Sequence, residues 1–89
     1  MSIKIDYKPK HGVSNLMQKA KKFGKDNGVE VKGNNKSGTV RKGGLLPVKG
    51  KYNINGDKIT IEVTQIPFLV SWGKARSEIL KWLKENDVK

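Results

Sequence analysis

The sequence predicts an α+β fold, in which an antiparallel β-sheet carries two helices on one face in the order β-α-β-β-β-β-α. Three observations predict it. Several segments alternate apolar and polar residues, as strands with one buried face do. Two further segments place apolar residues three and four positions apart, which is the spacing of a helix with one buried side. Because each element has a single apolar side, both helices are expected on the same face of the sheet, and the other face is left to water or to a partner.

The first half of the chain supplies one strand, one helix and two short strands. Residues 2–8 alternate Ile or Tyr with polar residues, and Pro9 ends this strand because proline cannot donate to a ladder. Residues 13–25 carry a narrow apolar stripe with helical spacing. Short strands are predicted at 29–32 and 39–42, with Gly, Asn and Ser between them as turn residues.

The second half supplies a hairpin and a helix. Residues 48–54 and 58–64 alternate clearly, and Asn55-Gly56 between them predicts a type I′ turn, in which both central residues need positive φ. Residues 71–86 have a wide apolar arc and are predicted to be helical. The last residues, 83–89, are expected to fray.

Length and composition set the scale of the fold. The 89 residues are expected to form a single domain, residues 1–89, and a hydrophobic content of 35% allows one modest core. The chain has no cysteine, which excludes disulfides and is typical of a reducing, cytoplasmic compartment. No apolar run reaches the roughly 18 residues of a membrane span, so we expect no transmembrane segment.

Basic charge is the strongest compositional feature. There are 19 basic and 8 acidic residues, and the formal net charge is +11. Seven of the basic residues lie between positions 31 and 58, where Asp57 is the one acidic residue. Charge at this density favours a polyanionic partner, which is nucleic acid, an anionic lipid surface or an acidic protein. The alternative is a surface whose lysines only keep the protein soluble.

The polar side of the predicted sheet is one candidate site. If the alternation holds, seven basic side chains share this side with three acidic ones, Asp6, Glu30 and Glu62. The predicted anion-binding residues are Lys4, Lys8, Lys32, Arg41, Lys49, Lys51 and Lys58. The solvent-facing aromatic residues that stack bases in sheet-type single-strand binders are missing from this pattern, so sequence-specific readout is not expected.

The segment Ile66–Val70, here called the elbow, is the other candidate site. It is more apolar than one inward side requires, because three successive apolar residues of an extended chain cannot all point the same way. The elbow either closes the end of the sheet as core or remains exposed and meets an apolar surface or a second subunit. In the second case the contact residues are Pro67, Phe68, Leu69 and Val70.

Catalytic and metal-binding patterns are missing from the sequence. His11 is the only histidine, and neither a nucleophile motif nor a second metal ligand accompanies it. His11 is therefore expected to pack or cap in a loop between strand and helix. We expect a protein that is not an enzyme and has no cofactor or metal.

Three stretches, which together span nearly the whole chain, carry a resemblance to a known family. They are residues 10–20, which contain His11; residues 44–54, which lead into an alternating strand; and residues 59–83, which contain the elbow. In order and pattern the chain resembles the small polyhydroxyalkanoic acid system proteins, which accompany polyhydroxyalkanoate granules. The resemblance implies a small accessory protein without enzymatic activity, associated with a granule surface in the cytoplasm.

A second resemblance points to nucleic acid. From Val13 onward, the order of helix, strands and helix is similar to that of double-stranded RNA-binding domains, which read RNA by its shape. Lys74 and Arg76 lie near the place of the lysines that contact phosphates in that family. The Gly-Pro-x-His loop of that family does not occur here. A nucleic-acid binder without sequence preference therefore stands as the alternative.

Overall fold

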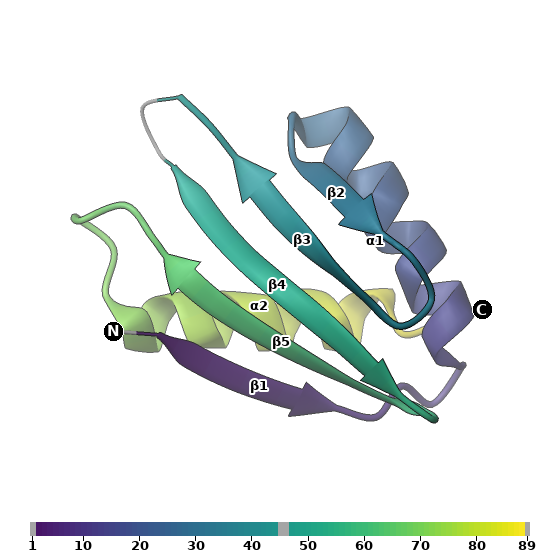
Figure 1. Ribbon diagram of the computed structural model, residues 1–89. Coiled ribbons are helices and arrows are strands. Elements are labelled where there is room, and N and C mark those ends of the chain that lie inside the picture. Colours follow the sequence, from purple (N-terminus) through teal and green to yellow (C-terminus); the bar gives the residue numbers. More distant parts are fainter. Residues whose placement is uncertain (1, 45–46, 89) are drawn as a thin grey trace.

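A computed structural model gives the fold and describes residues 2–44 and 47–88. Over these residues it contains a five-stranded antiparallel sheet and two helices, which confirms the predicted α+β class and element order (Figure 1). The elements are β1 (Ile3–Tyr7), α1 (Val13–Asn27), β2 (Glu30–Gly33), β3 (Ser37–Lys42), β4 (Val48–Asn55), β5 (Lys58–Gln65) and α2 (Trp72–Asn86).

The order of strands across the sheet is β1-β5-β4-β3-β2. Strands β2 to β5 follow one another through hairpins, and the first strand, β1, pairs antiparallel with the last, β5. The register places Ile5 opposite Ile61 and Ile61 opposite Tyr52. Because side chains alternate along a strand, this register collects the apolar residues on one face, the inner face, and the polar residues on the other, the outer face.

The core lies between the inner face and the two helices. Its buried residues come from five different elements and are Ile5, Leu16, Tyr52, Ile59 and Leu83. Leu16 belongs to α1 and Leu83 to α2, so both helices pack on the same face of the sheet, as the sequence predicts. The helices converge near the C-terminal end of the chain and diverge away from it (Figure 1).

The hairpin between β4 and β5 occurs where the sequence predicts it, but the predicted turn type is wrong. Asn55 pairs with Lys58 inside the ladder, so the two central residues are Gly56 and Asp57. Gly56 has a φ of 66°. The φ of Asp57 is not positive, because among the described residues only glycines have a positive φ. Positive φ at the first central residue alone is the pattern of a type II′ turn, which glycine at that position favours.

A register shift interrupts the pairing of β4 with β5 between Lys49 and Gly50. Lys49 lies opposite Gln65, whereas Gly50 lies opposite Val63, so one residue of β5 is skipped. A bulge of this kind bends the strand and re-aims the side chains beside it. The bend lies at the end of the sheet from which the elbow departs.

The expectation that residues 83–89 fray is wrong for residues 83–88. Leu83 is buried, and α2 continues to Asn86. The carbonyl oxygen of Val88 accepts a hydrogen bond of 2.7 Å from Asn15 Nδ2 and another from Lys19 Nζ, which both belong to α1. These contacts hold the end of the chain against the first helix, and residue 89 lies outside the described residues.

Candidate functional site: the elbow and the basic outer face

The elbow connects β5 to α2 as a tight turn whose tip is apolar. The N–H of Val70 donates to the carbonyl of Pro67 at 2.9 Å, and this bond places Phe68 and Leu69 at the tip. Phe68 is 93% exposed and Leu69 is 80% exposed. Pro67 and Val70 are half-buried at the base of the turn. Of the two interpretations that the sequence leaves open, the structure therefore supports the exposed one for the tip.

Local chemistry explains why the tip points away from the core. Pro67 has no N–H and a fixed φ, which suits the turn but ends the ladder of β5. At the other side of the turn, Ser71 caps α2, because its side chain accepts a hydrogen bond of 3.1 Å from the Lys74 N–H. Phe68 and Leu69, between Pro67 and Val70, span the reversal of the chain. Their side chains are thus left facing solvent.

The outer face of the sheet carries the predicted basic residues. Reading across five strands, one row contains Lys4, Glu62, Lys51, Thr39 and Lys32. In the strands, the register places six predicted anion-binding residues on this face, and all six are exposed: Lys4, Lys32, Arg41, Lys49, Lys51 and Lys58. The seventh, Lys8, is exposed one residue beyond β1.

Acidic neighbours neutralise part of this face. Lys51 Nζ lies 3.3 Å from Glu62, and this ammonium group holds the pKa of the Glu62 carboxyl below its ordinary value. Lys32 pairs with Glu30 at 3.6 Å, and Lys8 pairs with Asp57 at 3.3 Å. Among the described residues, the predicted set that has no acidic partner within ion-pair distance consists of Lys4, Arg41, Lys49 and Lys58.

Three of these unpaired residues lie at the same end of the sheet as the elbow. Lys49 is opposite Gln65, the last residue of β5, and Arg41 is opposite Lys49. Lys4 is near the start of β1, and its carbonyl accepts a hydrogen bond of 3.0 Å from Arg76 Nη1 of α2. In Figure 1 the connection between β5 and α2 projects from this end, near the N-terminus. An exposed apolar tip and unpaired cations therefore occur together.

A polar cluster at the opposite end of α2 is not foreseen from the sequence. Asp87 is buried and accepts hydrogen bonds from the N–H groups of Lys10 at 2.7 Å and His11 at 3.0 Å. The Tyr7 hydroxyl also donates to it, at 2.8 Å. Burial acts to raise the pKa of the Asp87 carboxyl, but the three donors outweigh it and the pKa lies below its ordinary value.

This cluster gives His11 a structural place. Its side chain is exposed, and the contact with Asp87 is made by its backbone N–H. His11 lies in the loop between β1 and α1 as predicted, but its side chain neither packs nor caps, because it is exposed and α1 starts after Gly12 without a side-chain cap. Burial and the neighbouring Asp87 carboxylate raise the pKa of Tyr7. Across residues 2–44 and 47–88, acidic and histidine side chains do not gather in threes as a metal site requires.

Comparison of the chain with known protein families, with curated proteins and with solved structures finds no match. In the part of the chain that the structure describes, neither helix is long and apolar enough to cross a membrane. The features that bear on function are therefore those of the molecule itself, the elbow and the outer face.

Proposed function

We propose that the protein is a binding protein without enzymatic activity, which attaches to an anionic surface with an apolar interior by inserting the tip of the elbow. The observation that carries the proposal is the exposure of Phe68, at 93%, and of Leu69, at 80%, on a turn with fixed ends. Large exposed apolar side chains in adjacent positions are typical of contact sites with membranes or partners.

Attachment to the surface requires both the apolar tip and the basic residues at this end of the molecule, because neither gives enough binding free energy alone. Burying one Leu or Phe side chain contributes about 1.5–3 kcal/mol, so two inserted side chains alone give weak attachment. Each Lys or Arg near an anionic surface adds about 1 kcal/mol. Arg41, Lys49 and Arg76 lie at the elbow end and are exposed. Together the two contributions reach an affinity that neither supplies alone.

Two biological surfaces share this chemistry. One is the cytoplasmic face of a membrane with anionic lipids. The other is a polyhydroxyalkanoate granule, which the resemblance of residues 10–20, 44–54 and 59–83 implies. Both combine an apolar interior with a charged boundary, and the elbow is suited to either of them.

Vesicle sedimentation tests the proposal. We expect the chain to bind vesicles of phosphatidylcholine with 30% phosphatidylglycerol at low salt, and to bind pure phosphatidylcholine at least tenfold more weakly. The variant Phe68→Ser/Leu69→Ser should fold normally and lose at least tenfold in affinity for the anionic vesicles. Wild-type binding by this variant would overturn the insertion of the elbow.

Charge is tested with a matched pair of variants. Arg41→Glu/Lys49→Glu and Lys21→Glu/Lys22→Glu change the net charge equally, but the second pair lies on the exposed side of α1. Only the first pair should reduce binding strongly. If both reduce it equally, net charge rather than the elbow end determines attachment.

Particles of polyhydroxybutyrate distinguish the two surfaces. Bare particles and particles coated with the anionic lipid mixture are incubated with the wild-type chain. Binding to the bare polymer, lost in Phe68→Ser/Leu69→Ser, would identify the polymer itself as the target. Binding only to coated particles would identify the lipid layer.

Nucleic acid binding is a second candidate function, favoured by the basic outer face, which lies opposite the helices. Lys4, Arg41, Lys49 and Lys58 would contact phosphates without reading bases. On duplex DNA, log Kd should then change with log salt with a slope of about 0.9 per phosphate neutralised. A filter-binding titration that detects no binding at about 50 mM salt would remove this candidate.

A further inference from the structure

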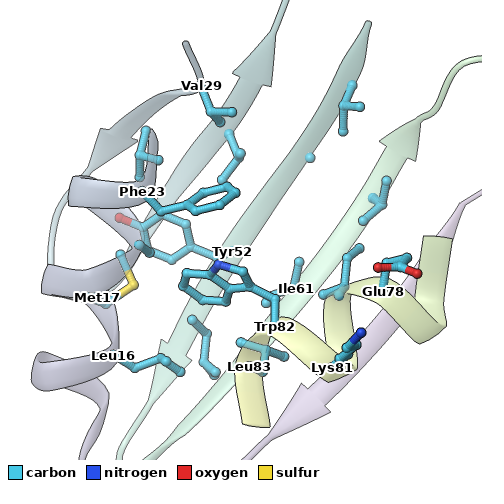
Figure 2. Close-up of a pocket in the computed structure, with 18 of the residues that line it drawn as sticks. Leu16, Met17, Phe23, Val29, Tyr52, Ile61, Glu78, Lys81, Trp82 and Leu83 are labelled. Atoms are coloured by element: carbon cyan, nitrogen blue, oxygen red, sulfur yellow. The ribbon is translucent and has the colours of Figure 1, made fainter. Parts of the chain in front are cut away.

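A cavity of about 520 Å³ opens between the two helices and the inner face of the sheet (Figure 2). Its floor includes Val40, Val48, Gly50 and Val63, and its walls include Phe23 of α1 and Trp82 of α2. Figure 2 shows Phe23, Tyr52 and Trp82 turned toward the same space from three elements. The volume lies within the range of small-molecule sites, about 300–1,000 Å³.

The cavity follows from the way the helices cover the sheet. Helix α1 lies against β2, and α2 lies against β1, which are the two edge strands. Edge strands of a five-stranded sheet are about 19 Å apart, since neighbouring strands are about 4.8 Å apart, whereas packed helices lie about 8–10 Å apart. The helices meet where Phe23 and Trp82 make an edge contact with ring centres 5.4 Å apart. Elsewhere the helices leave parts of β3 and β4 half-exposed, at Val40, Val48 and Gly50.

The chemistry of the interior selects a hydrocarbon. The cavity walls are mainly Val, Leu, Ile and aromatic side chains. In the described part of the chain, every buried side-chain nitrogen and oxygen atom already has a hydrogen-bond partner. A ligand with polar atoms inside the cavity would lose its hydrogen bonds to water without replacement. A saturated hydrocarbon chain has no hydrogen bonds to lose, and the burial of its apolar surface is favourable.

The charge at one end of the cavity selects an anionic head group. Lys42 is half-buried and lies opposite Val48, a residue of the floor, on the inner side of the sheet. Among the described residues, Lys42 has no acidic partner within ion-pair distance. On the α2 side the cavity borders Glu78, whereas Lys81 there pairs with Glu85 at 4.0 Å. The free positive charge on the inner side is thus at the end of β3.

We infer that this cavity binds one hydrocarbon chain of an anionic amphiphile, such as a long-chain fatty acid, with its carboxylate beside Lys42 and its tail directed toward Leu16 and Leu83. This site goes beyond the proposed surface attachment and does not depend on it. The elbow lies outside the cavity wall, so the two sites can be tested separately.

Dodecanoate below its micelle concentration is the probe, and Trp82 is the reporter. A Trp72→Phe background leaves Trp82 as the one tryptophan. We expect saturable dodecanoate binding with a blue shift of Trp82 emission, confirmed by calorimetry. Val48→Phe, which fills the floor of the cavity, should weaken binding at least tenfold. Ala20→Leu fills the α1 side and gives a second test if Val48→Phe does not fold.

The head group is tested by charge and by ligand. Lys42→Ala should weaken dodecanoate binding at least tenfold, whereas Lys21→Ala on the outside of α1 should leave it unchanged. Dodecanol should bind at least tenfold more weakly than dodecanoate. Equal binding of the two ligands, or wild-type binding by a folded cavity-filling variant, would overturn the inference.

Two further measurements distinguish the cavity from the elbow and from a dimer interface. Phe68→Ser/Leu69→Ser should bind dodecanoate normally even if it no longer binds vesicles, and a parallel loss would refute separate sites. Light scattering gives the oligomeric state. If the chain is a dimer that Val48→Phe dissociates, and dodecanoate does not bind, a second copy covers the cavity and the inference is wrong.

Discussion

The two ends of α2 are built in opposite ways. At the closed end, residues 83–88, Leu83 is 2% exposed, and the carboxylate of Asp87 receives three hydrogen bonds from the first strand and the loop after it. At the open end, the elbow leaves Phe68 and Leu69 in solvent. One helix thus joins a polar anchor, where every group is satisfied, to an apolar tip, where burial is incomplete.

The difference separates stability from contact. Interactions at the closed end link segments far apart in the sequence, and their loss should destabilise the fold. The tip at the open end makes no such link, so selection for stability alone gives no reason to keep two large apolar residues there. Substitutions at the two ends should therefore have opposite consequences for folding and for binding.

Two leucines give the largest expected contrast. Leu83→Ala leaves a cavity in the core and should lower the free energy of unfolding by about 2–5 kcal/mol. Leu69→Ala removes a side chain that is 80% exposed and should change it by less than about 0.5 kcal/mol. Urea unfolding monitored by tryptophan fluorescence measures both. Comparable losses in the two variants would mean that the tip is packed in solution.

The second largest effect is expected from acid, which should reduce the stability that the closed end contributes. The folded-state pKa of Asp87 is depressed, so the stability it contributes is complete above its unfolded pKa and is lost as pH falls through the folded pKa. In thermal unfolding from pH 6 to pH 2, the midpoint of the wild type should fall steeply below about pH 4. Asp87→Asn should be less stable at pH 6, since its NH₂ group faces donors, and should fall less steeply. Parallel curves would contradict the assignment.

The cap at the open end should have a moderate effect. Ser71→Ala removes the acceptor for the Lys74 N–H and should cost about 1 kcal/mol of stability. Ser71→Asp is the matched control, since aspartate also caps a helix and suits the positive end of its dipole. Thermal unfolding of both variants measures the difference. A Ser71→Ala variant as stable as the wild type would show that the turn itself fixes the start of α2.

The surface ion pair of α2 should have the smallest effect. Lys81 and Glu85 are exposed and 4.0 Å apart, in the i,i+4 arrangement. Lys81→Ala should change the free energy of unfolding by no more than about 0.5 kcal/mol. Urea unfolding at low and high salt should show almost the same difference from the wild type. An effect above about 1 kcal/mol would indicate that Lys81 supports the wall of the cavity.

Periodicity was sufficient to predict the class, the order of elements and the composition of both faces. Alternation in residues 3–7 and 58–65 sets which side chains face the core, and a five-strand register preserves it. The turn type at Gly56 could not be obtained in this way, because Asn55-Gly56 and Gly56-Asp57 are both acceptable turn pairs. The pairing of Asn55 with Lys58 decides between them.

Local periodicity predicts some residues of the candidate sites and misses others, because it carries no information about contacts between distant segments. The basic residues of the outer face follow from local alternation. Asp87 could not be found, because its donors lie more than 70 positions away along the chain. The exposure of Phe68 and Leu69 depends on a turn bond between Pro67 and Val70, which composition does not reveal. The cavity depends on the distance between the two helices. That distance follows from the width of the sheet, which local sequence patterns do not reveal.

The pairing of β1 with β5 also governs the order in which the chain can fold as it is synthesised. The hairpins from β2 to β5 can form as each strand leaves the ribosome, because their partners are neighbours in the sequence. Ile5, however, has no opposite residue until Ile61 emerges, and the backbone of Lys10 has no acceptor until Asp87 does. The nascent chain therefore keeps Ile5 and the backbone of Lys10 without their native partners until late in translation.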